Sequence, residues 1–262
     1  MEHVARKRFG QNFLQDSSVI QHIVSVVGPA PEQHFVEIGP GLGALTCAFL
    51  PVVGEMDVVE LDRDLIPKLE AQCKGLGELR VHNADALKFD FSCLMKNNMR
   101  LRIVGNLPYN ISTPLLFHLL DQADCINDMH FMLQKEVVER MAAKPGGKDY
   151  GRLSVMVQYH CQVEKLFIVS ADAFKPRPKV DSAIVHLTPH LTPPVAVEDK
   201  KMLSRLVNQA FSQRRKTLHN SLKGLLGDEQ FTTAGINPGL RAEQLSLEQF
   251  AALANQAIAR SK

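Results

Sequence analysis

The chain has 262 residues, of which 45% are hydrophobic and 22% charged, and its formal net charge at pH 7 is +2. These values are typical of a globular protein with a sizeable core, and they exclude a disordered chain, a fibrous chain and a polycation. Any contact with nucleic acid must therefore come from local clusters of basic residues and not from the overall charge.

The five cysteines are widely spaced and form no C-x-x-C pair. This argues against a disulfide framework or a structural zinc site and indicates a reducing compartment, so we predict no bound metal. The charged N-terminal residues are not followed by an apolar signal segment, and no apolar run approaches membrane-spanning length. A soluble cytoplasmic protein without membrane contact is the default expectation.

Strand and helix patterns alternate along most of the chain. After an N-terminal arm at 1–18, we predict a helix at 19–27, a strand at 34–39, a helix at 44–50, a strand at 56–61, a helix at 65–73, strands at 79–82 and 101–104, a helix at 114–123, a strand at 128–133, helices at 137–143 and 153–160, an extended segment at 166–170 and a strand at 183–188. Strands separated by helices predict an α/β fold with a Rossmann-like, doubly wound, mostly parallel sheet.

The composition changes near residue 190. Thr192-Pro193-Pro194 is typical of a linker, and residues 199–262 contain three helical patterns and no convincing strand. We predict one domain at 1–190 and a small all-α domain at 191–262.

A glycine-rich turn, Gly39-Pro40-Gly41-Leu42-Gly43, separates the strand at 34–39 from the next helix, and Glu37 precedes it. Glycines let the backbone approach a ligand closely and leave the helix N-terminus open. The next strand ends at Glu60 and Leu61, where a carboxylate can accept hydrogen bonds from both ribose hydroxyls. A tight structural turn is the alternative, but the glycine spacing with Glu60 favours a nucleoside-type cofactor.

The third strand ends at Asn83-Ala84-Asp85-Ala86. The carboxylate of Asp85 could accept a hydrogen bond from the exocyclic amine of an adenine. Equally, Asp85 could cap the following segment. Because it follows the glycine turn and Glu60 in order, we place Asp85 and Ala86 in the predicted cofactor site.

The loop at 104–110, Val-Gly-Asn-Leu-Pro-Tyr-Asn, should form a turn at the carboxyl end of a strand, where ligands bind in open α/β sheets. Pro108 lacks a donor and biases Leu107 away from helix. The side-chain oxygen of Asn106, a free carbonyl and the ring of Tyr109 would suit a flat heterocycle with an exocyclic amine. The alternative is an ordinary strand-to-helix loop.

Together these motifs resemble those of S-adenosylmethionine-dependent methyltransferases, and Asn106-Leu107-Pro108-Tyr109 resembles the motif of enzymes that methylate exocyclic amines of bases. More narrowly, the chain resembles the ribosomal RNA adenine dimethyltransferase family, most closely its bacterial small-subunit members. The segments that carry this resemblance are Lys7–Leu14, Val104–Pro114, Phe131–Glu136, Phe174–Ser182, Arg214–Thr217 and Asn220–Leu222. These segments are spread from the N-terminal arm to the helical region, so the resemblance extends over nearly the whole chain.

The resemblance implies S-adenosylmethionine as the cofactor. Asn12 and Leu14 from the arm would line its pocket, and Gly39, followed by Gly41, would pass close to its methionine part. Glu60 would hold the ribose. The cofactor's adenine amine would be bound by Asp85, which Ala86 follows.

On the substrate side, Asn106 would bridge cofactor and target, and Tyr109 with Phe174 would stack on the target adenine. Hydrogen bonds from the amine to the Asn106 side-chain oxygen and the Leu107 carbonyl would favour a pyramidal nitrogen and stabilise developing positive charge. No strong general base is then required, because the proton can leave after the methyl has moved. Pro108 would constrain the loop geometry.

Three basic clusters would contact RNA phosphates, which position RNA without reading its sequence. They are Arg6, Lys7 and Arg8; Lys175, Arg177 and Lys179; and Arg214, Arg215 and Lys216. Taken singly, each basic cluster is typical of an ordinary solvent-exposed surface.

The implied function is dimethylation of two adjacent adenines near the 3′ end of small-subunit rRNA, by a monomer acting on an immature 30S particle. An assembly factor with little or no catalysis and a methyltransferase of large-subunit RNA are the alternatives. A nicotinamide dehydrogenase has least support from the glycine spacing.

Overall fold

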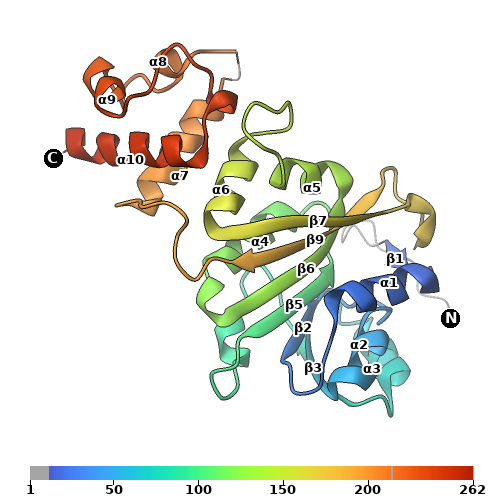
Figure 1. Cartoon of the computed structure of the whole chain (residues 1–262). Helices are drawn as coiled ribbons and strands as arrows, with labels where there is room; N and C mark the ends of the chain where they lie inside the picture. The colour runs from blue at the N-terminus through green and yellow to red at the C-terminus, as the bar shows by residue number, and fades with distance from the viewer. Residues whose placement is uncertain (1–11, 214, 262) are drawn as a thin grey trace. The chain divides into compact units, whose positions relative to one another are not determined.

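The computed structural model describes residues 12–213 and 215–261, and its centre is a seven-stranded sheet of order β4-β3-β2-β5-β6-β9-β7 (Figure 1). Its strands are β2 (Phe35–Ile38), β3 (Glu55–Glu60), β4 (Glu78–Asn83), β5 (Leu101–Asn106), β6 (Ile126–Gln134), β7 (Cys161–Val169) and β9 (Ser182–Pro189). The pairs from β4 across to β6 are all parallel, and β9 pairs with β6 in the antiparallel direction. The predicted mostly parallel sheet is confirmed.

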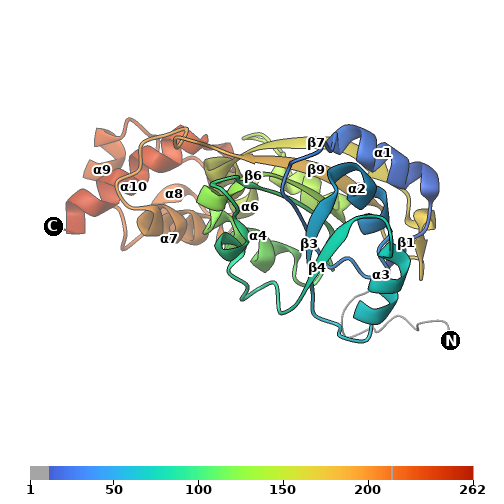
Figure 2. The same cartoon turned by 90° about the horizontal axis from the view of Figure 1, so that it is seen from below.

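Helices cover both faces of this sheet, as a doubly wound fold requires. In Figure 2 the helices labelled α1, α2 and α3 lie on one face of the sheet and α4 lies on the other. Their bounds are α1 (Ser17–Val27), α2 (Thr46–Val53), α3 (Ile66–Cys73) and α4 (Ser112–Leu120). The core beneath the first three helices includes Phe35, Phe49 and Leu69, all fully buried. No helix among the described residues is both long and apolar enough to cross a lipid bilayer.

The strand order reverses at β2, which has β3 on one side and β5 on the other. Successive connections leave to opposite faces at this point, so a crevice opens beyond the carboxyl ends of β2 and β5. Backbone contact is close there, because a Cβ added at Gly105 would lie 2.6 Å from the carbonyl oxygen of Ile38. The glycine turn after β2 and the loop after β5 therefore meet at one edge of the sheet.

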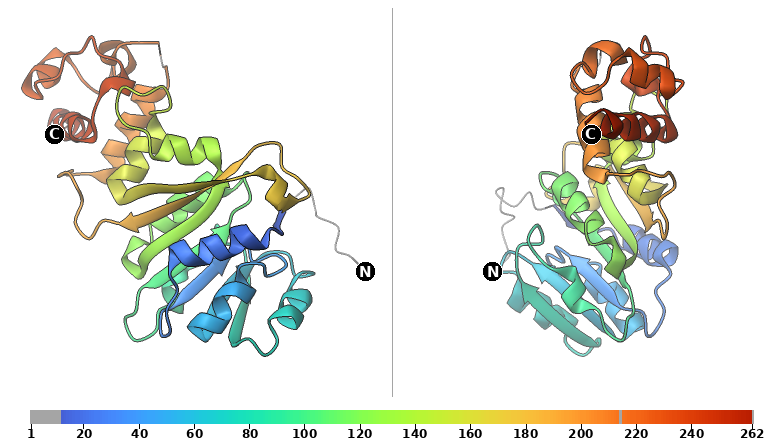
Figure 3. Two further views of the ribbon diagram at one scale, coloured as in Figure 1. Left: turned by 45° about the vertical axis from the view of Figure 1, so that its right-hand side comes forward. Right: turned by 90° about the vertical axis from the view of Figure 1, so that its left-hand side faces the viewer.

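A two-stranded sheet joins β1 (Phe13–Leu14) to β8 (Phe174–Lys175), with Leu14 opposite Phe174. The N–H of Gln15 extends the pairing by donating to the carbonyl of Ala173 at 2.9 Å. In Figures 1 and 3 the dark-blue start of the described chain meets the yellow segment that contains β8. No sequence pattern predicted this pairing, because two-residue strands have no measurable periodicity.

Contacts divide the chain into two compact units, one of residues 1–138 and 164–189 and the other of residues 139–163 and 190–262. The helices of the remaining chain are α5 (Lys135–Met141), which runs across a unit boundary, and α6 (Arg152–His160), α7 (Lys200–Phe211), α8 (Leu218–Ser221), α9 (Asp228–Thr233) and α10 (Leu247–Ser261) of the second unit. One contact boundary falls beside the predicted one at residue 190. Residues 139–163 instead group with the helical unit, where Tyr150 packs edge-on against Phe211. The division at 190 into separate domains stays a prediction.

Substituting Gly105→Ala should lower the free energy of unfolding by about 1 to 3 kcal/mol, because the new methyl group would overlap the Ile38 carbonyl. Urea unfolding measures this change. Gly151→Ala is the matched control, since a Cβ there meets nothing within 4 Å, and it should cost about 0.5 kcal/mol or less. Equal costs for the two variants would contradict the close approach of β2 and β5.

Candidate functional site

A cavity of about 430 Å³ opens at the carboxyl edge of the sheet, large enough for a nucleoside-sized ligand. It is bounded by the end of the arm and by the segments that follow β2, β3, β4 and β5. All the predicted cofactor-binding residues line it, as do four of the predicted catalytic residues: Asn12, Leu14, Gly39, Gly41, Glu60, Leu61, Asp85, Ala86, Asn106, Leu107, Pro108 and Tyr109. The structure therefore brings together residues that are far apart in the sequence.

The glycine turn and Glu60 are joined directly. Gly39 and Gly41 have φ values of 68° and 59°, a region that side chains disfavour, so the turn needs glycine at both positions. The N–H of Gly41 donates to one oxygen of Glu60 at 3.1 Å, and the N–H of Asp62 donates to the other at 2.7 Å. These bonds fix the Glu60 carboxylate, and each oxygen keeps a further lone pair that can accept from a ribose hydroxyl.

Glu37, which precedes the glycine turn, is a second acidic group on the cavity wall. No separate role was predicted for it from the sequence. Its side chain is buried at the end of β2 and accepts a hydrogen bond from the Thr46 hydroxyl at 2.6 Å. Burial raises its pKa to about 8, and the nearby charge of Glu60 acts in the same direction. The raised pKa favours the uncharged form of Glu37. Burial also raises the pKa of Glu60.

Asp85 follows the end of β4 by two residues. It has the features of a capping residue and of a cavity residue, which the sequence left as alternatives. Its carboxylate accepts from the N–H of Leu87 at 3.0 Å, which is a capping interaction. It also lines the cavity. Because an ionised carboxylate has about four acceptor positions, the cap does not prevent Asp85 from accepting a hydrogen bond from an exocyclic amine.

The side chain of Asn106 is oriented by the N-terminal arm. Its amide nitrogen donates to the backbone carbonyl of Asn12 at 2.9 Å, which assigns the amide orientation from the hydrogen-bond network. The side-chain oxygen is then available to a donor in the cavity. The N–H of Leu107 donates to the carbonyl of Met132 at 3.2 Å, so β6 holds the loop in place.

The two predicted stacking residues, Tyr109 and Phe174, differ in their surroundings. The half-buried ring of Tyr109 lines the cavity, and its hydroxyl shares a hydrogen bond with that of Ser182 at 2.9 Å. Phe174 is 5% exposed, pairs with Leu14 and is not among the described residues that line the cavity. Its role in stacking on the target base remains a prediction.

The basic clusters are only partly described. Arg6, Lys7, Arg8 and Arg214 lie outside the described residues. Lys175, Arg177 and Lys179 are exposed in the first unit, and Arg215 and Lys216 are exposed in the second. Asp172 forms an ion pair with Arg177 at 3.1 Å and offsets part of that charge. The exposure of these side chains suits phosphate contacts, which stay a prediction.

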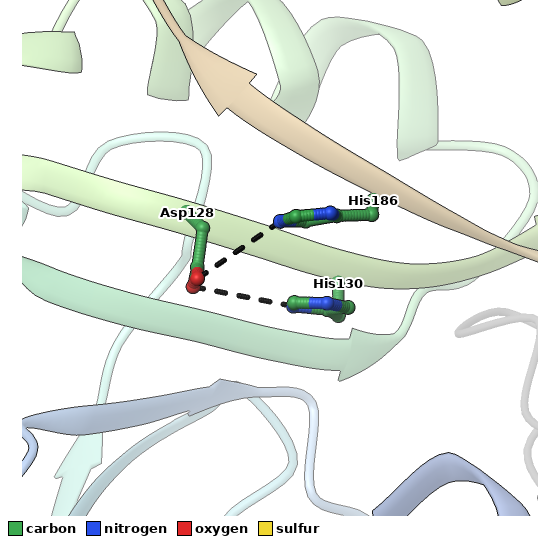
Figure 4. A group of neighbouring side chains, drawn as sticks. All are labelled: Asp128, His130 and His186. Atoms are coloured by element: carbon green, nitrogen blue, oxygen red, sulfur yellow. Dashed lines mark ion pairs between the residues drawn. The ribbon is translucent and has the colours of Figure 1, made fainter. Parts of the chain in front are cut away.

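Among the described residues, one group of potential metal ligands lies outside the cavity (Figure 4). It consists of Asp128 and His130 on β6 and of His186, the cross-strand partner of His130 on β9. The two imidazole rings stack with their centroids 4.2 Å apart and an angle of 10° between planes. A metal ion lies in the plane of a ligating imidazole, so parallel stacked rings cannot direct their lone pairs at one ion.

The carboxylate of Asp128 is already engaged by Arg102. The Nε of Arg102 donates to both oxygens of Asp128, at 3.0 and 3.1 Å. Burial lowers the pKa of His130 to about 4, so this ring is neutral. In the geometry shown, the group is a packed ion-pair cluster between β5, β6 and β9.

The profile of the family described as ribosomal RNA adenine dimethylase matches residues 2–259. The chain belongs to this family. It is 58% identical over 256 residues to the ribosomal RNA small subunit methyltransferase A of Marinomonas sp. (strain MWYL1), an alignment that covers 98% of the chain and 96% of the relative.

Solved structures agree with this membership. A dimethyladenosine transferase from Plasmodium falciparum is similar with a TM-score of 0.75 and 27% identity, over 92% of this chain and 95% of that one. The 23S rRNA methyltransferase ErmE is similar with a TM-score of 0.72 and 26% identity, over 94% of this chain and 100% of that one. The predicted family, class I methyltransferase fold, enzyme class and S-adenosylmethionine cofactor are confirmed. The roles of single residues stay predictions.

The raised pKa of Glu37 predicts a pH-dependent stability. An unfolded glutamate has a pKa near 4.5, whereas folded Glu37 keeps its proton up to about pH 8. The folded state therefore binds the extra proton between these values. The contribution of Glu37 to stability should then fall as the pH rises, by on the order of 1 kcal/mol per pH unit. Glu37→Gln keeps the acceptor for Thr46 but cannot ionise, so it should remove this slope. Urea unfolding of both proteins across this range measures the slopes, and parallel curves would contradict a protonated Glu37.

Proposed function

We propose that the protein dimethylates the exocyclic amines of two adjacent adenines near the 3′ end of small-subunit (16S) rRNA, acting as a cytoplasmic monomer on an immature 30S particle. The observation that carries this proposal is the convergence of Glu60, Asp85 and Asn106 on one cavity beside the ring of Tyr109. The choice of the small subunit is supported by the relative of 58% identity, whose name specifies it.

The cofactor half of the cavity fits S-adenosylmethionine, which supplies an electrophilic methyl group on a sulfonium. The fixed carboxylate of Glu60 would accept hydrogen bonds from the ribose hydroxyls, and that of Asp85 would accept one from the adenine amine. Leu14 is 6% exposed and forms an apolar part of the wall. A Cβ at Gly39 would meet nothing within 4 Å, so this glycine has open space beside it for the methionine part. Gly41 would support the turn through the bond from its N–H to Glu60.

The target half of the cavity is adapted to a weakly nucleophilic amine. The lone pair of an adenine amine is delocalised into the ring. Acceptance of its two N–H groups by the Asn106 side-chain oxygen and the Leu107 carbonyl favours a pyramidal nitrogen and stabilises the positive charge that develops during transfer. Removing a preorganised partner of this kind typically costs about 3 to 4 kcal/mol in the transition state. The proton leaves after transfer, so no strong base is needed.

A target adenine must leave its stack to reach these acceptors. Extruding a base costs a few kcal/mol, and stacking on an aromatic face recovers about 1 to 3 kcal/mol of it. Tyr109 provides such a face on the cavity wall, next in the chain to Pro108. Lys175, Arg177 and Lys179 are exposed on the first unit and would contact phosphates of the same RNA.

Asn106→Ala should lower the rate of methyl transfer about a hundredfold or more, because it removes one of the two acceptors for the amine. The assay incubates protein with labelled S-adenosylmethionine and under-methylated small subunits and locates the label in the RNA. Asn127→Ala, which removes an exposed amide near the start of β6, is the control and should retain wild-type activity. Absence of label from adenine with the wild type would refute the function, and equal rates for the two variants would refute the mechanism.

The competing function is binding of the immature subunit with methylation secondary. Glu60 distinguishes them, because its side chain is buried at the cavity and cannot act as an RNA contact on the surface. We expect Glu60→Ala to abolish transfer while binding of small subunits stays unchanged in a sedimentation assay. If this variant also supports subunit maturation fully, binding is the main role and the catalytic proposal for maturation is wrong.

A further inference from the structure

Tyr109 makes a hydrogen bond that the catalytic proposal does not use. Its hydroxyl lies 2.9 Å from the hydroxyl of Ser182, and one of the two donates to the other. Tyr109 belongs to the loop after β5, whereas Ser182 is the first residue of β9. The sheet order is β5-β6-β9, so this bond reaches past the end of β6.

Ser182 is itself held in a rigid position. Its exposed fraction is 0%, and it pairs in register with Gln134 of β6. The preceding residue, Asp181, accepts from the N–H of Lys135 at 3.0 Å through its carbonyl and from the N–H of Ala171 at 3.1 Å through its carboxylate. The Ser182 hydroxyl is therefore presented from a backbone that is fixed on both sides.

This bond has a direct consequence for the aromatic face. The hydroxyl oxygen of a tyrosine lies on the long axis of the ring, so fixing the oxygen fixes the direction of that axis and the place of the ring on the cavity wall. The phenol is also engaged with Ser182, which leaves the ring face of Tyr109 for the cavity. Ser182 is not among the described residues that line the cavity, so it can influence a bound base only through Tyr109.

We propose that Ser182 is a positioning residue for methyl transfer, whose hydroxyl anchors the Tyr109 ring at the place on the cavity wall where it stacks on the target adenine. This inference rests on the proposed function. It assigns the Tyr109 hydroxyl an anchoring task and explains why the aromatic residue of this loop is a tyrosine, since phenylalanine would stack but could not be anchored.

A double-mutant cycle tests the proposal. Ser182→Ala and Tyr109→Phe each remove the same hydrogen bond, so each should slow single-turnover methyl transfer about three- to tenfold, the range expected for one neutral hydrogen bond. The double variant should be no slower than the slower single variant, because nothing remains to lose. The dissociation constant for S-adenosylmethionine should stay within about twofold of the wild-type value in all three variants, since the bond does not touch the cofactor.

Ser154→Ala is the matched control, because Ser154 is another fully buried serine, and its hydroxyl bonds to the backbone carbonyl of Arg140 in the second unit. It should lower stability without changing the transfer rate. Multiplicative losses in the double variant, unchanged rates in the single variants, or an equal loss in Ser154→Ala would each overturn the positioning role. A wild-type protein that transfers no methyl group would instead refute the proposed function, so the two failures are distinguishable.

Discussion

The parallel pairing of β2 with β5 is the constraint on which the site depends. These strands meet where the order of the sheet reverses, and their backbones approach so closely that Gly105 has no room for a Cβ beside Ile38. The turn that begins at Gly39 and the loop that begins at Leu107 consequently share one edge. A cofactor pocket and a target pocket can then be built side by side without any further element between them.

Charge in the cavity is controlled by burial and by backbone donors. Two N–H groups hold Glu60, while burial raises the pKa of Glu37 and so favours its uncharged form. The cavity thus has fixed acceptors before any ligand enters, which is the condition under which polar groups contribute most to binding and catalysis. The carbonyl of Asn12 orients the Asn106 amide in the same way, so the N-terminal arm supports the catalytic loop as well as the cofactor wall.

The antiparallel strand β9 adds a second layer of support. Ser182, at its start, reaches Tyr109, and His186, further along, stacks on His130 above the Asp128–Arg102 ion pair. The first interaction is a hydrogen bond and the second is ring stacking, and together they tie β9 to the loop after β5 and to β6. This part of the sheet therefore stabilises the loop that carries the aromatic face, although it contributes no residue to the described lining of the cavity.

The sequence alone determined the alternation of strands and helices, the glycine turn, and the acidic or amide residue at each strand end: Glu60, Asp85 and Asn106. These are local signals, because hydrophobic periodicity and the ends of strands can be recognised within a few residues of sequence. Only the tertiary structure decided the pairing of β1 with β8, the grouping of residues 139–163 with the helices, the protonation of Glu37 and the bond between Tyr109 and Ser182. Each of these features depends on groups that come together from distant parts of the chain and on the exclusion of water around them. No single stretch of residues contains that information.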